Sequence, residues 1–132
     1  MSETIVQSVG DTRIEIDLLN GGRIGSLCVG GHELLVTGAP DPLRWGLYPM
    51  APFAGRVAAG GFEYEGVRHS LPRTAGDHAI HGTVLDRPWL AEDDSTFVCE
   101  LGESWPFAGF ARQSIRLLED GLLLRLEAHT TG

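Results

Sequence analysis

Apolar and polar side chains alternate along the first part of this sequence, and this period of two residues limits what the chain can fold into. Ile14, Ile16 and Leu18 fall on one face of an extended chain, while the charged residues between them fall on the other. No window shows a sustained period of 3.6 residues, which an amphipathic helix requires. The sequence therefore predicts an all-β, largely antiparallel fold, with a sandwich favoured over a barrel.

Glycine-rich turns divide the chain into short strands. Gly accounts for 18 of 132 residues, which is about twice the average usage of ~7%. Turns are predicted at 20–22 and 30–31, followed by a strand over 32–36. Later strands are predicted over 96–101, 109–118 and 122–128, and the Asp120-Gly121 pair predicts a type I′ hairpin between the last two. A chain of this length is expected to form one domain over residues 1–132.

The charge of the chain excludes two classes of partner. The formal net charge is −8, and no cluster of Lys and Arg is present. Nucleic acid binding needs such clusters to neutralise phosphates, and an anionic membrane surface attracts them for the same reason. No apolar run approaches the ~20 residues of a membrane span, and no signal sequence opens the chain. We therefore expect a cytoplasmic protein without nucleic acid or membrane partners.

The stretch from Trp45 to Trp89 concentrates the unusual residues of the chain. It holds two of the three Trp and three of the five His, and prolines interrupt its regular backbone. Aromatic faces, a guanidinium and imidazoles are the groups that hold a polyhydroxylated ring. Four aromatic residues of this stretch are expected to belong mainly to the core. They are Trp45, Tyr48, Phe53 and Trp89.

Arg56, His81 and His78 are the candidate binding residues. Arg56 is either a surface residue paired with an acid or a pocket guanidinium that bonds vicinal hydroxyls. His81 precedes Gly82, and its imidazole is either structural or bonded to a sugar oxygen, where it could also act as an acid or base near neutral pH. His78 is expected to be a supporting neighbour. No catalytic residue can be assigned in this chain, which also lacks a Gly-x-Ser-x-Gly nucleophile motif.

A metal site at the histidines is the alternative to sugar binding. His69, His78 and His81, together with a carboxylate, offer ligands that zinc accepts. In an extended segment, however, residues three apart point to opposite faces, and neither Cys is nearby. We therefore expect no metal and no other cofactor.

Several motifs of this chain, taken together, resemble the N-terminal part of the aldose 1-epimerase (galactose mutarotase) family. The most specific are the Pro-Met-Ala-Pro-Phe-Ala-Gly-Arg block ending at Arg56 and the Ala-Ile-His-Gly block ending at Gly82. The others occur in the order of the family. They are Gly21–Leu27, Glu33–Val36, Gly61-Phe62 with Gly66, Trp89, Trp105-Pro-Phe107 and Asp120-Gly121.

The resemblance implies a β-sandwich of the galactose mutarotase type and the interconversion of α and β anomers of a hexose, without a cofactor. It places sugar-binding roles on Arg56 and His81. Gly55 stands where many members have Asn, so one polar contact to the sugar differs. The catalytic His and Glu of the family and a sugar-binding Asp lie beyond the matched region. The resemblance thus implies an incomplete sandwich that binds sugar but is inactive alone.

Two further hypotheses compete with an epimerase portion. The first is a carbohydrate-binding module that kept the Arg and His contacts without catalysis. The second is a structural or assembly domain that self-associates through an open sheet edge, because the last predicted strand ends the chain without a closing element. The epimerase portion and the carbohydrate-binding module both predict a small-molecule hexose as partner, whereas the assembly domain predicts another polypeptide chain.

Overall fold

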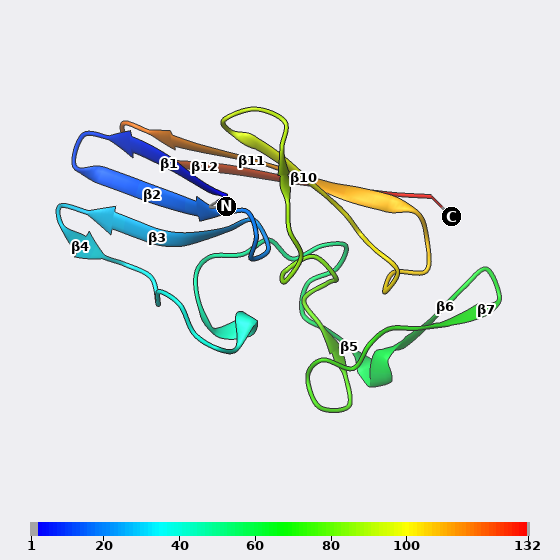
Figure 1. The fold of residues 1–132 in the computed structure, drawn as a ribbon. Coiled ribbons are helices and arrows are strands. Elements are labelled where there is room, and N and C mark those ends of the chain that lie inside the picture. The colour runs from blue at the N-terminus through cyan, green and yellow to red at the C-terminus, as the bar shows by residue number, and fades with distance from the viewer. Residues whose placement is uncertain (1–2, 132) are drawn as a thin grey trace.

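Two four-stranded antiparallel sheets form the body of the protein, in a computed structural model that describes residues 3–131 (Figure 1). The first sheet follows the order of the sequence. Its strands are β1 (Thr4–Val9), β2 (Thr12–Asp17), β3 (Arg23–Val29) and β4 (His32–Glu33). The second sheet has the order β12-β11-β10-β9. Its strands are β9 (Leu90–Ala91), β10 (Thr96–Glu100), β11 (Gly109–Leu118) and β12 (Gly121–Thr130).

Two small ladders and two single 3-10 turns lie in the connection between the sheets. β5 (Arg56–Val57) pairs with β8 (Ala79–Ile80), and β6 (Gly61–Tyr64) pairs with β7 (Val67–Ser70). The 3-10 turns are η1 (Pro42–Arg44) and η2 (Ala58–Gly60). Within the described residues, no helix has the length and apolar character of a membrane span.

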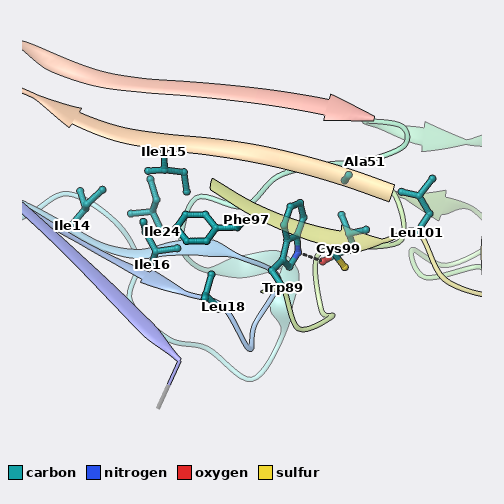
Figure 2. Packing of buried hydrophobic residues seen from close by; sticks show 12 residues of the cluster. Ile14, Ile16, Leu18, Ile24, Ala51, Trp89, Phe97, Cys99, Leu101 and Ile115 are labelled. Carbon is teal, nitrogen blue, oxygen red and sulfur yellow. Dashed lines mark hydrogen bonds between the residues drawn. The ribbon is translucent and has the colours of Figure 1, made fainter. Parts of the chain in front are cut away.

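The core lies between the two sheets, and the predicted alternation builds it. Ile14 and Ile16 of β2, and Leu18 directly after it, are at most 1% exposed. They meet Phe97 and Ile115 of the second sheet, as Figure 2 shows. Each such side chain contributes ~1.5–3 kcal/mol by leaving water. The prediction of an all-β antiparallel sandwich is confirmed.

Two glutamine side chains connect the sheets across this core. Gln113 of β11 is buried, and its Nε2 donates to the carbonyl oxygen of Gly22 at 2.7 Å. Gln7 of β1 donates from Nε2 to Ile115 O and accepts the N–H of Leu117, both at 2.8 Å. The Gln7 amide thus bonds β11 as a neighbouring strand would.

The fourth strand ends at Glu33, earlier than the predicted Val36. The Glu33 carboxylate accepts the Ser26 hydroxyl and the N–H groups of Leu27 and Leu35, at 2.9 and 3.2 Å for the two amides. These bonds, led by that of Ser26, lower the pKa of Glu33 to about 2. The side chain takes the place of a partner strand, so the ladder stops there.

The hairpin between β11 and β12 is present, but its turn is not type I′. Leu118 pairs with Gly121, so the two central residues are Glu119 and Asp120. A type I′ turn needs positive φ at both central residues, and neither they nor Gly121 has one. The glycine instead follows the central pair, a position that type I turns favour. The predicted turn at 30–31 does have positive φ at both glycines, 56° and 81°.

Candidate functional site

The β5–β8 ladder brings two of the predicted binding residues together. Arg56 pairs with Ile80, the last residue of β8, and His81 follows directly after that strand. The His81 N–H donates to Gly55 O at 2.9 Å, and the Gly55 N–H donates to His81 Nδ1 at 3.2 Å. An imidazole that accepts at Nδ1 carries its neutral-form proton on Nε2. His81 is therefore prepared to donate a hydrogen bond from Nε2.

The backbone around His81 adopts a conformation that the surrounding chain enforces. His81 has φ of 58°, in the left-handed region that costs a non-glycine residue free energy. Gly82 follows with φ of 82°, and a Cβ there would collide with the carbonyl oxygen of Ala51. The Thr83 N–H donates to that same oxygen at 2.8 Å. Close packing against Ala51 thus explains the glycine after the histidine.

His78 is oriented in the same manner. Its Nδ1 accepts the N–H of Ala59 at 3.0 Å, and its backbone exchanges two hydrogen bonds with Ala75. The expectation that His78 and His81 point to opposite faces assumed an extended chain, but only Ala79–Ile80 is a strand there. Both imidazoles instead bond the segment 55–59 that carries Arg56. Among residues 3–131, no group of three or more metal-ligating side chains is found.

The Arg56 guanidinium is exposed and unpaired. Within the part of the chain that the structure describes, it makes no hydrogen bond or ion pair. Arg56 thus lies on the surface, as the first alternative expected, but without the acidic partner among these residues, and it does not line the cavity described below. No carboxylate of this part bonds His78 or His81 either. The donors of this cluster are therefore available to a ligand. Among the described residues, His78 and His81 have no carboxylate partner for proton transfer. The imidazole–carboxylate pair of His129 and Glu127, at 3.7 Å, lies on β12.

Only one of the four aromatic residues expected in the core is fully buried. Trp89 is 2% exposed and donates from Nε1 to Val84 O at 3.2 Å (Figure 2). Phe53 is half-buried, with its ring centroid 6.3 Å from that of Trp105. Trp45 and Tyr48 are also half-buried, and both rings lie against a guanidinium.

That guanidinium belongs to Arg23, a structural residue for which the sequence predicted no role. Arg23 is completely buried, and burial lowers the pKa of its guanidinium. Its carbon Cζ lies 4.4 Å from the Trp45 ring centroid and 4.9 Å from that of Tyr48. The Tyr48 ring is in turn 6.1 Å from the His81 ring. Arg23 therefore supports the loop that packs against the candidate site, and the only sequence signal was an Arg directly after two glycines.

A cavity of about 430 Å³ adjoins the segment around His81. Ile80 and Gly82 line it, but Arg56, His78 and His81 do not. Its polar lining consists of hydroxyls and carboxylates. These residues are Thr74, Thr83, Ser104, Asp41 and Asp86. The predicted residues thus form an exposed cluster beside this cavity and are not its walls.

Solved structures share this architecture. A galactose 1-epimerase from Lactobacillus acidophilus NCFM is 18% identical with a TM-score of 0.72, over 94% of this chain and 42% of that one. A galactose mutarotase-like protein from Clostridium acetobutylicum is 18% identical with a TM-score of 0.75, over 98% and 46%. The Slr1438 protein from Synechocystis sp. PCC 6803 is 19% identical with a TM-score of 0.75, over 100% and 49%.

These likenesses confirm a fold of the galactose mutarotase type, and the chain spans less than half the length of these structures. A comparison with curated proteins finds no match. The family model described as aldose 1-epimerase matches residues 12–132. With nearly the whole chain matched by that model, the protein belongs to the aldose 1-epimerase family.

Proposed function

We propose that this chain carries the sugar-orienting part of an aldose 1-epimerase site, with a hexose as its ligand. Arg56 and His81 donate hydrogen bonds to hydroxyl oxygens of the ring, and His78 supports them. The observation that carries the proposal is the pair of bonds between Gly55 and His81. These two bonds hold the His81 imidazole with Nε2–H as the free donor. His81 directly follows Ile80, which pairs with Arg56.

The unpaired state of Arg56 supports the same role. A guanidinium presents its donors in a planar fork, which matches two neighbouring hydroxyl oxygens. Because Arg56 has no acidic partner among the described residues, a hexose need not displace one to bind. The net charge of −8 further favours a neutral sugar over a sugar phosphate.

The proposed catalytic contribution of these three residues is orientation. Exchange of anomers requires a base to take the proton of the C1 hydroxyl and an acid to protonate the ring oxygen. The ring then opens, the C1 carbonyl group rotates, and closure follows on its other face. Each positioned acid or base typically contributes 10²–10⁴-fold. With no carboxylate bonded to either imidazole in residues 3–131, we propose that this chain binds hexose without turning it over.

Titration with D-galactose and D-glucose, followed by NMR, tests the binding role. We expect Arg56→Ala and His81→Asn each to weaken binding at least tenfold. Asn is chosen because it tolerates the left-handed conformation of His81. Arg13→Ala and His32→Ala, both on the first sheet, serve as matched controls and should bind as the parent chain does. Unchanged binding in both Arg56→Ala and His81→Asn would remove the site assignment.

Polarimetry on freshly dissolved α-D-galactose tests the separation of binding from catalysis. We expect the optical rotation to change at the spontaneous rate when the 132-residue chain is present. Acceleration that is lost in His81→Asn would show that the chain contains a working acid or base, and this would overturn the proposal that its role is orientation.

A further inference from the structure

The turn η2 joins two separate ladders, and its backbone is strained (Figure 1). β5, before the turn, pairs with β8, whereas β6, after the turn, pairs with β7. Ala59 and Gly60 have φ of 55° and 66°. The N–H of Gly61 donates to the carbonyl oxygen of Ala58, which completes the geometry of a type I′ turn. Asn, Asp or Gly is favoured where Ala59 stands, so an alanine there needs support from its surroundings.

Two side chains hold the peptide groups of Ala59, one from each side of the turn. His78 Nδ1 accepts the N–H of Ala59 at 3.0 Å, and Arg73 Nε donates to the Ala59 carbonyl oxygen at 3.1 Å. His78 directly precedes β8, and Arg73 follows shortly after β7. The N–H of Leu71 donates to Gly60 O at 2.6 Å and brings the segment that carries Arg73 against the turn. The left-handed conformation of Ala59 is therefore held by an imidazole and a guanidinium.

A second turn of the same kind, in the β6–β7 hairpin, is held differently. Glu65 and Gly66 have φ of 50° and 78°. Tyr64 and Val67, on either side of them, pair with each other in the ladder. Within residues 3–131, no side chain bonds the peptide groups of Glu65. One ladder encloses that turn, whereas η2 runs from one ladder into another and is held by side chains instead.

The held residue lies at one end of the segment that carries Arg56. At the other end, the N–H of Gly55 donates to His81 Nδ1 at 3.2 Å. Arg56 thus lies between two backbone N–H groups that are each anchored to an imidazole. If Ala59 relaxed to negative φ, its N–H would turn away from His78, and the segment would lose one of these two anchors.

We propose that Arg73 is a positioning residue for the sugar site. Its guanidinium holds the carbonyl group of Ala59, which keeps the turn left-handed and so keeps Arg56 in place to donate to the hexose. Arg73 acts through the backbone and does not itself touch the sugar. This inference rests on the proposed hexose binding by Arg56 and His81, and it adds a residue for which the sequence predicted no role.

The expected effect on affinity follows from the population of the left-handed turn. A ligand that binds one conformation has its dissociation constant raised by the inverse of the fraction of molecules in that conformation. Loss of one hydrogen bond from a charged donor shifts such an equilibrium by roughly tenfold. Arg73→Met, which keeps the length of the side chain and removes its donors, should therefore weaken hexose binding roughly tenfold. Arg73 is exposed, so this variant leaves the core intact.

Second-site variants at Ala59 test the proposal by NMR titration with D-galactose and D-glucose. Arg73→Met should weaken binding roughly tenfold and should speed the exchange of the Ala59 amide hydrogen with water by a similar factor. Adding Ala59→Gly to Arg73→Met should restore the affinity to within about threefold of the parent chain, because glycine adopts positive φ without support. If Arg73 contacted the sugar directly, Ala59→Gly would not restore binding, and this result would overturn the positioning role.

Glu65→Gly is the matched control for the second-site variant. It relieves the same kind of strain in the β6–β7 turn, so Glu65→Gly added to Arg73→Met should leave the affinity low. Recovery of binding in that control would assign the loss to general stability and would overturn the proposal. Arg116→Met, which removes an exposed guanidinium on β11, should bind as the parent chain does.

The exchange rate of Ala59 separates the two levels of the inference. Unchanged exchange in Arg73→Met would overturn the role of Arg73 in holding the turn, whatever the affinity for hexose. A parent chain that binds neither hexose would instead overturn the proposed function, and with it the ligand of this inference, while the exchange rate still reports on the turn.

Discussion

Replacing Arg23 should lower the free energy of unfolding more than replacing any exposed arginine. Its guanidinium is wholly buried and donates hydrogen bonds to four backbone carbonyls. These carbonyls belong to three separate segments, the turn between β2 and β3 and two parts of the connection between the sheets. Nε donates to Asn20 at 2.6 Å, Nη1 donates to Pro42 at 2.7 Å and Trp45 at 2.8 Å, and Nη2 donates to Leu85 at 2.6 Å. Arg23→Met keeps the length of the side chain and removes every donor.

The expected loss follows from two opposing terms. Each hydrogen bond that involves a charged group contributes ~1.5–3 kcal/mol, and four are lost. Burial of the guanidinium itself costs several kcal/mol, and the variant no longer bears this cost. We therefore expect a net loss of ~4 kcal/mol. For 132 residues, an unfolding entropy of ~2.1 cal/mol/K per residue converts this loss into a Tm lower by ~14 °C.

Urea unfolding followed by tryptophan fluorescence, with thermal unfolding by circular dichroism, measures this loss. Arg44→Met is the matched control, because the Arg44 side chain is 79% exposed and, among residues 3–131, forms an ion pair only with Asp41, at 3.4 Å. The control should change stability by less than ~0.5 kcal/mol. Arg23→Lys keeps one donor group and should fall between the two. An Arg23→Met variant within 1 kcal/mol of the parent chain would refute the role of these bonds.

Three further variants test other contacts of the structure. Hydrogen bonds hold the pKa of Glu33 at about 2 in the folded chain against 4.5 ordinarily, so the stabilisation by its carboxylate is complete above pH 4.5 and is lost as pH falls through 2. In Glu33→Gln, the free energy of unfolding measured in urea should therefore depend less on pH over that window. Gly82→Ala should lower the free energy of unfolding by more than ~2 kcal/mol, because the added Cβ collides with the backbone of Ala51. Gly76→Ala is the control: its φ is 62° but no atom lies close to the added Cβ, so it should cost ~1 kcal/mol. Gln7→Ala removes two bonds to the backbone of β11 and should cost ~1–3 kcal/mol by thermal unfolding, and an unchanged Tm would contradict this bridge.

The longer strands were predictable because burial on one face gives their sequence a period of two residues, whereas the two-residue strands β5, β8 and β9 are too short to show one. The predicted strand over 109–118 has the same bounds as β11, and the residues 14, 16 and 18 fill the core as expected. Turn geometry was less predictable. The Asp120-Gly121 pair indicates a hairpin, but the pairing of Leu118 with Gly121 decides which two residues are central. A local dipeptide signal does not determine that register.

The candidate site shows the same division between local and long-range information. Arg56 and His81 are far apart in the sequence, and the β5–β8 ladder brings them together by pairing Arg56 with Ile80, the residue before His81. Their spacing contains no sign of this pairing, and the family resemblance implied a sugar-binding role for each residue but not the contact between their segments. Arg23 was missed because its partners are backbone carbonyls, which no residue type reveals.

The left-handed conformation of His81 allows backbone strain to be separated from sugar binding. At φ of 58°, a side chain with a Cβ costs ~1–2 kcal/mol more than glycine does. His81→Ala and His81→Gly both remove the imidazole and the bond from Gly55, so both should lose sugar binding to the same extent. His81→Gly should nevertheless be more stable than His81→Ala by ~1 kcal/mol in urea unfolding. Equal stability of the two variants would show that the backbone relaxes freely at this residue, and the packing of Gly82 on Ala51 would then not be what enforces the left-handed conformation of His81.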